Sequence, residues 1–214
     1  MRILRKGKMQ QNRGRKERTG CRYGKLMRTL ILNGSPRPQG DTAHLIQALR
    51  RELPGEVEQV DAYRTSVAPC VDCRGCFHQP GCVVRDDMDA IYQLVDGADV
   101  IVLASPLYFS TLTGSLLALC SRFQALYAGR VQGFFAPAKA KTGVVLLTAG
   151  GSTKEPACAL KTARIILAEL GAPAQFSAVS LHTDQLPAQA DQEALRQIRQ
   201  IAHSLRRKQE GLPQ

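Results

Sequence analysis

The sequence predicts an α/β protein built on a doubly wound parallel sheet, and three observations support this. Strand-sized apolar segments alternate with helical patterns five times along the chain. Residues 100–105 are a continuous apolar run, as expected of a central strand that is covered on both faces, and residues 142–148 are expected to form another buried strand. Glycine and hydroxyl-bearing residues directly follow several of the strands. In such sheets ligands bind beyond the carboxyl ends of the strands, where the winding direction reverses.

The elements follow from local patterns. Apolar residues at positions 45, 46, 49 and 53 give the first helix its buried stripe, and Asp86 or Asp87 is expected to cap the second. Pro156 suits the first turn of the fourth helix, and Gly171 suits its end. Strands are expected at residues 29–33, 56–63, 100–105, 142–148 and 175–179, helices at 42–53, 88–98, 113–127, 156–170 and 191–205, and loops at 69–84 and 128–140. Cys120 and Cys158 fall on apolar helix faces and are expected to be buried.

Three loops are expected to converge at the carboxyl edge of the sheet. The first runs from Gly34 to Ala43 into a helix, and it combines an arginine and hydroxyl groups with the free N–H groups of a helix start, a composition suited to phosphate. It is neither a Walker loop nor a dinucleotide fingerprint. The second loop, residues 105–111, carries two aromatic residues that suit a flat ring. The third, residues 148–152, is a glycine turn in which backbone N–H groups can reach a ring edge.

The pattern Leu-Asn-Gly-Ser-Pro-Arg-x-x-Gly-Asp-Thr, with Ser-Pro-Leu-Tyr-Phe after the third strand, closely resembles the flavodoxin-like NAD(P)H-dependent FMN reductase superfamily. The resemblance extends from Met27 to Leu205. It implies a flavodoxin-like three-layer αβα sandwich with a five-stranded parallel sheet of order 2-1-3-4-5, and a bound FMN. The chain has Gly40-Asp41-Thr42 where the family more often has Ser-Asn-Thr or Gly-Asn-Thr. Because a carboxylate facing a phosphate is unfavourable, Asp41 is expected to cap the helix.

The resemblance also implies which residues contact FMN. The phosphate would be held by Ser35, Arg37, Asp41, Thr42 and Ala43. The ring and ribityl chain would be lined by Pro106, Leu107, Tyr108 and Phe109, while Ala149 and Gly150 would approach the far edge of the ring. No side chain is expected to act as a nucleophile, since the flavin carries the chemistry.

A cysteine-rich segment separates the second strand from the second helix. Cys70, Cys73, Cys76 and Cys82 have the spacing C-x2-C-x2-C-x5-C, which can supply four thiolates to one [4Fe–4S] cluster. The spacing fits structural zinc less well. With the following Val-Val-Arg-Asp-Asp-Met, it resembles the iron–sulfur flavoprotein branch, in which a cluster passes electrons to FMN. A zinc site, a redox-active dithiol and free thiols remain the alternatives.

The predicted function is therefore an FMN-dependent oxidoreductase with a [4Fe–4S] cluster at these cysteines. The alternative is a cluster-free NAD(P)H-dependent FMN or quinone reductase. In either case the electron donor and acceptor would be small molecules or redox proteins. The resemblance implies a homodimer or homotetramer.

Net charge suggests a function of another class, because the 214 residues carry a formal charge of +11. Residues 1–26 hold ten Lys and Arg and one acid, which gives +9 and leaves +2 for the rest. Such a tail could dock nucleic acid or an anionic surface, but Tyr23 is its only aromatic residue and it has no apolar helical face, so nucleic acid is not the expected partner. We interpret residues 1–26 as a disordered tail or a segment foreign to the native chain, 27–208 as one FMN-binding domain and 209–214 as a polar tail. Without a membrane-length apolar run or a signal peptide, the sequence predicts a cytoplasmic protein with no membrane partner.

Overall fold

The computed structural model describes residues 26–136, 138–151 and 156–210. Three predicted features therefore lie outside the described residues: the basic tail except for Leu26, Ser152 of the glycine turn, and residues 211–214. The five strands are parallel and pair in the order β2-β1-β3-β4-β5, which confirms the predicted sheet. Their bounds are β1 Arg28–Asn33, β2 Glu56–Asp61, β3 Val100–Pro106, β4 Thr142–Ala149 and β5 Ala174–Leu181.

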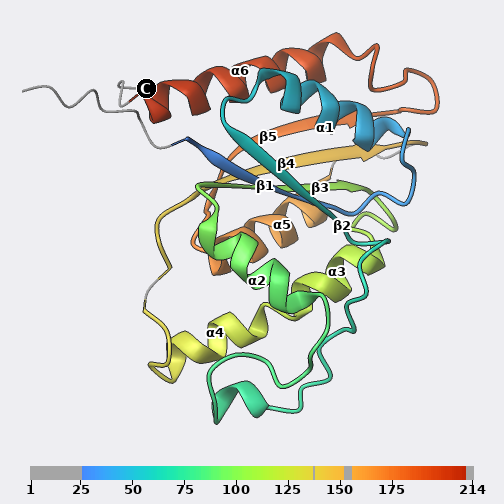
Figure 1. Cartoon of the computed structure of the whole chain (residues 1–214). Coiled ribbons are helices and arrows are strands. Elements are labelled where there is room, and N and C mark those ends of the chain that lie inside the picture. The colour runs from blue at the N-terminus through green and yellow to red at the C-terminus, as the bar shows by residue number, and fades with distance from the viewer. Residues whose placement is uncertain (1–25, 137, 152–155, 211–214) are drawn as a thin grey trace, which may run out of the picture.

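Helices cover both faces of the sheet and form the outer two layers of a sandwich (Figure 1). On one side lie α1 (Asp41–Glu52) and α6 (Gln192–Gln209); on the other lie α2 (Met88–Gly97), α3 (Gly114–Ser121), α4 (Gln124–Val131) and α5 (Ala157–Glu169). No helix within the described ranges is both long and apolar enough to cross a bilayer.

Alternation along the strands divides the core into two apolar clusters. Ile31 and Val102 pack toward α1 and α6, whereas Leu30 and Leu103 pack toward α2, α3 and α5. All of these side chains are at most 1% exposed, and β4 is buried along its whole length. The sheet thus fixes a rigid carboxyl edge from which the functional loops extend.

Two predictions that lie outside the loops at the carboxyl edge are wrong. The single helix expected over residues 113–127 is two helices, because the chain tightens at Arg122 and Phe123, whose N–H groups donate to the carbonyls of Leu119 and Cys120, three residues back. Cys120 is buried as predicted, but Cys158 is exposed. It stands in the first turn of α5, on the side away from the buried residues of that helix, which are Ala159, Ala163 and Leu167.

Candidate functional site

The β1–α1 loop is held by a chain of short-range hydrogen bonds. The side-chain amide of Asn33 donates to Asp61 at the end of β2 (2.8 Å), and its oxygen accepts the N–H of Ser35 (2.9 Å). The hydroxyl oxygen of Ser35 then accepts the N–H of Arg37 (3.2 Å). These contacts fix the loop before any ligand binds, which lowers the entropic cost of binding.

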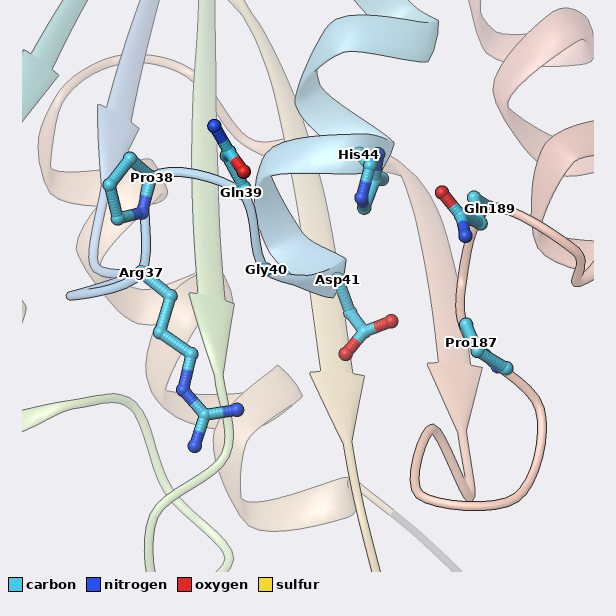
Figure 2. Close-up of a pocket in the computed structure, with 8 residues that line it drawn as sticks. All are labelled: Arg37, Pro38, Gln39, Gly40, Asp41, His44, Pro187 and Gln189. Atoms are coloured by element: carbon cyan, nitrogen blue, oxygen red, sulfur yellow. The ribbon is translucent and has the colours of Figure 1, made fainter.

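The start of α1 has the properties of an anion site. Within the described residues no side chain caps this helix, whose N-cap residue is Gly40, so its first backbone N–H groups remain available to an acceptor. Arg37 is exposed and has no acidic partner among the described residues. Its guanidinium and the carboxylate of Asp41 point in the direction in which the strands run, toward the carboxyl edge of the sheet (Figure 2).

Asp41 does not cap α1 as predicted. Its Oδ1 accepts the N–H of Ala188 (2.8 Å), and so ties the first turn of α1 to the β5–α6 connection. The cap fails because Asp41 is itself the first helical residue, while Gly40 occupies the N-cap position. The neighbouring Thr42 is buried, and its hydroxyl is 2.7 Å from that of Thr148 at the end of β4. This pair joins the first and third loops.

The loop after β3 makes a tight, strained turn. Tyr108 and Thr111 form an isolated antiparallel bridge, and the two residues between them, Phe109 and Ser110, have φ values of 51° and 61°. Such left-handed conformations are costly for residues other than glycine and often occur at functional sites. Phe109 is fully exposed and Tyr108 is about two-fifths exposed. Both aromatic rings are thus available at the carboxyl edge.

The glycine turn after β4 is packed against the segment that follows β5. The carboxylate of Asp184 accepts the N–H of Gly151 (2.6 Å), and a ring nitrogen of His182 lies 2.9 Å from the carbonyl oxygen of Gly151. A Cβ atom at Gly150 would lie 2.6 Å from the Asp184 carboxylate, so a larger residue there would require the Asp184 side chain to move. Sequence reasoning overlooked Asp184; because β5 is the neighbour of β4 in the sheet, the segment after β5 was a predictable contributor to the same edge.

One cavity of about 170 Å³ brings the three loops together. It is lined by nine of the eleven residues predicted to contact FMN, namely Ser35, Arg37, Asp41, Thr42, Pro106, Leu107, Tyr108, Ala149 and Gly150. Ala43 is buried behind it and Phe109 lies outside its lining. Other lining residues include Thr148, Thr183 and Asp184. A second cavity of about 510 Å³ adjoins it and shares Arg37, Gly40 and Asp41 (Figure 2).

The cysteine loop extends from β2 and passes below α3 and α4 in Figure 1. It contains one 3-10 turn, η1 (Gly75–Phe77), which the sequence did not predict. Asp72 and Arg74, on either side of Cys73, have φ values of 50° and 59°, so the backbone on both sides of this cysteine is left-handed, at a cost in strain. All four predicted cluster ligands are free thiols.

The four thiols lie in one neighbourhood but do not converge. Burial raises the pKa of the Cys76 thiol, although a hydrogen bond to the backbone of the same residue opposes this, and the charges of Cys82, Cys70 and Cys73 raise it further. Among the described residues, no three His, Cys, Asp or Glu side chains are arranged to hold a metal ion. The chemistry of the donor set nevertheless fits an iron–sulfur cluster, because four soft thiols share a single loop. Binding would require the loop to close.

Comparison with known proteins identifies the family. The family model for NADPH-dependent FMN reductase matches residues 27–185. The chain belongs to this family. Among curated relatives, it is 33% identical over 99 residues to an iron–sulfur flavoprotein of Archaeoglobus fulgidus (45% of each chain). It is 35% identical over 99 residues to one of Methanosarcina thermophila (45% of this chain and 52% of the relative). The matches thus span about half the length of these relatives.

Solved structures support the fold of this FMN reductase family member. The NAD(P)H:quinone oxidoreductase of Methanothermobacter marburgensis superposes with a TM-score of 0.64 at 16% identity, over 84% of this chain and 96% of that one. An FMN-dependent NADH-azoreductase of Bacillus anthracis, in complex with FMN, superposes with a TM-score of 0.54 at 15% identity. The match covers 84% of this chain and 99% of that one. At these identities the likeness shows a shared flavodoxin-like fold.

Proposed function

We propose that this protein is an oxidoreductase that holds FMN at the carboxyl edge of its sheet. The observation that carries the proposal is the convergence of the three loops on one cavity. Beside it lie the start of α1, which no described side chain caps, and Arg37, which has no acidic partner among the described residues. Family membership supports the same cofactor. FMN, when bound, accepts or donates electrons one at a time or two at once as a hydride. The protein supplies binding, orientation and electrostatics.

The proposed roles follow from the geometry of each loop. Arg37 and the backbone N–H groups at the start of α1 neutralise and orient the phosphate, assisted by Ser35, Thr42 and the backbone of Ala43. Asp41 lines the same cavity, and its hydrogen bond to the Ala188 N–H disperses the charge of a carboxylate that would otherwise repel the phosphate. The cavity suits the phosphate and ribityl end, so the ring would extend beyond it. Pro106, Leu107, Tyr108 and Phe109 would flank the ring, with Ala149 and Gly150 at its far edge.

Reduction of the flavin by NAD(P)H is part of the proposal. The family is described as NADPH-dependent, and a nicotinamide would stack on the exposed ring because no separate nicotinamide fingerprint is present in the sequence. The acceptor would be a small molecule or a redox protein. Assembly as a homodimer or homotetramer stays a prediction.

We further propose that Cys70, Cys73, Cys76 and Cys82 bind a [4Fe–4S] cluster. The donor set, the strained backbone around Cys73 and the likeness to relatives named iron–sulfur flavoproteins support this over a cluster-free reductase. Such a cluster, when bound, exchanges single electrons at a potential tuned by its surroundings. The four thiols would provide its ligands.

Anaerobic purification followed by flavin, iron and sulfide assays tests both parts. The proposal predicts one FMN per chain, with iron and acid-labile sulfide each near four, as a four-iron cluster requires. Cys73→Ser should abolish the cluster and leave the FMN content unchanged, whereas Cys158→Ser should change neither. Bound flavin without iron, even after reconstitution, would refute the cluster and support the cluster-free reductase. A chain that binds no FMN at saturation would contradict the proposal as a whole.

A further inference from the structure

Arg122 is the most deeply buried cation in the described part of the chain, with 1% of its surface exposed. It stands at the junction of α3 and α4. Its Nη1 donates to the carbonyl oxygen of Ala68 (2.9 Å) and to the carboxylate of Asp86 (2.6 Å). Its Nη2 donates to the carbonyl oxygen of Val84 (3.0 Å). All three partners belong to the segment between β2 and α2, far from Arg122 in the sequence.

These partners are the two ends of the cysteine loop. Ala68 lies two residues before Cys70, and Val84 lies two residues after Cys82. Asp86 strengthens the closure, because its carboxylate also accepts the N–H of Ala68 (3.1 Å) and of Met88 (3.0 Å). A single guanidinium therefore joins the beginning and the end of the segment that carries all four cysteines. We call Arg122, Asp86, Ala68 and Val84 the clasp.

The elements around the clasp hold it in place. The hydroxyl of Ser121, next to Arg122, accepts the N–H of Cys70 (2.9 Å) and donates to the carbonyl oxygen of Ala118 (2.6 Å). The hydroxyl of Tyr92 in α2 donates to the carbonyl oxygen of Arg122 (2.7 Å). The first cysteine is thus anchored to the end of α3, while the rest of the loop is exposed or half-buried.

Stability alone does not account for an arginine at this position. Replacing a buried ion pair by apolar residues of similar volume is often neutral or stabilising. Moreover, Nε of Arg122 is buried without a hydrogen-bond partner among the described residues, which is unfavourable. What an apolar side chain cannot do is bind two carbonyls and a carboxylate from both ends of one loop, and this argues for a role in positioning.

We propose that Arg122 is a positioning residue that closes the base of the cysteine loop and keeps its four thiols together. The inference rests on the proposed role of this loop as a cluster site. Closure at the base reduces the number of conformations that the loop samples, so less entropy is lost when the thiols gather around iron. Arg122 would act through the loop and would not itself be a ligand.

The test compares the thiol chemistry of the full chain, with FMN in excess and before iron is added, in Arg122→Met and Arg122→Lys. Rates of alkylation are measured by peptide mass mapping for Cys76 and Cys82, which are half-buried, with the exposed Cys70 and Cys73 as references. Opening of the clasp should raise the rates at Cys76 and Cys82 by about threefold or more in Arg122→Met. Arg122→Lys can keep the pair with Asp86 but cannot bind both carbonyls. Its alkylation rates should therefore lie between those of the unmodified chain and those of Arg122→Met. Cys120, buried in the core, should stay protected.

Iron reconstitution gives a second readout. Arg122→Met should bind less than half of the iron that the unmodified chain binds, with an unchanged affinity for FMN. Leu167→Ala, a buried site in α5 outside the clasp, serves as the control for general destabilisation. Unchanged alkylation rates in Arg122→Met, or an equal rise in Leu167→Ala, would overturn the proposal. If Arg122→Met does not fold, as exposure of Cys120 would reveal, the same criteria apply to Arg122→Lys.

The design separates the two claims. An unmodified chain that takes up no iron would refute the cluster, and the clasp would then be judged by the alkylation rates alone. An unmodified chain that takes up iron, together with an Arg122→Met variant that takes up the same amount at the same rate, would refute the positioning role while the cluster stood.

Discussion

At the scale of single residues, Arg37 has the clearest role in binding. It is exposed, has no acidic partner within the described residues, and lines the cavity at the start of α1. The guanidinium can therefore pair with a phosphate without breaking an existing contact. Its position was predictable from the sequence, because the loop follows a strand and opens a helix. The local backbone conformation was not, since it depends on the hydrogen bond from the Arg37 N–H to the Ser35 hydroxyl.

Replacing Arg37 by alanine should weaken FMN binding specifically through the phosphate. Loss of a charge-assisted hydrogen bond costs about 1.5–3 kcal/mol, or roughly 10–150-fold in the dissociation constant. Quenching of flavin fluorescence measures this. Riboflavin, which lacks the phosphate, should bind the variant and the unmodified chain equally, and Arg50→Ala at the other end of α1 should change neither affinity. Equal losses for FMN and riboflavin would show that Arg37 does not contact the phosphate.

Gly34 is required by packing. A Cβ atom there would lie 2.8 Å from Oγ1 of Thr113 and 2.9 Å from Leu116, where the first loop packs against α3. Gly34→Ala should therefore lower the free energy of unfolding by about 1–3 kcal/mol, as overpacking does. Gly114→Ala is the matched control, because nothing lies within 4 Å of its Cβ position. Equal stability of the two variants in denaturant titrations would contradict this account.

At the scale of elements, the strands and most helices follow from local patterns, and their predicted bounds agree with the structure to within a few residues. The break between α3 and α4 does not. The apolar stripe continues through Leu119 and Phe123, so the sequence indicates one helix. The break falls at Arg122, whose guanidinium binds Asp86, 36 residues away, and such a tertiary contact leaves no local signal.

The pair of Asp86 and Arg122 predicts a pH dependence. Burial by itself would raise the pKa of Asp86, but hydrogen bonds from Arg122, Met88 and Ala68 outweigh it and hold the pKa below its ordinary value of 3.8. A lowered pKa in the folded state contributes stability above the ordinary value, and this is lost as pH falls through the folded value. Asp86→Asn should therefore be less stable than the unmodified chain at pH 7, by an amount that shrinks below about pH 4. Denaturant titrations at pH 7 and pH 3 measure the free energy of unfolding of both chains. If the difference between them is as large at pH 3 as at pH 7, the ion pair is not its cause.

At the scale of the whole molecule, the predicted sheet order is confirmed, and the carboxyl edge gathers most of the predicted FMN contacts. The three loops could be predicted to meet because parallel strands end at one edge. The segment after β5 was predictable at this edge on the same ground, but the contact of Asp184 with Gly151 was not, since it depends on how that segment folds back. The shared donor set of the cysteines was predictable from their spacing, but the closure of their loop was not, because it depends on Arg122, far along the sequence.

Cys120 reports on the integrity of the whole core. Burial raises the pKa of its thiol to about 12, so at pH 8 both its ionisation and its access to reagents are suppressed in the folded state. Alkylation of Cys120 should require global unfolding, whereas the exposed Cys158 should react at the rate of an unfolded peptide. The Cys120 rate should rise with denaturant in parallel with unfolding. Rapid labelling of Cys120 in buffer would contradict the described packing of α3.

The most direct test of the FMN site is a paired titration of the flavin-free chain with FMN and riboflavin, followed by flavin fluorescence. We expect one FMN per chain, bound at least about tenfold more tightly than riboflavin, because the phosphate would meet Arg37 and the start of α1, which no described side chain caps. Equal affinity for the two flavins, or no binding of FMN, would show that this edge of the sheet is not an FMN site.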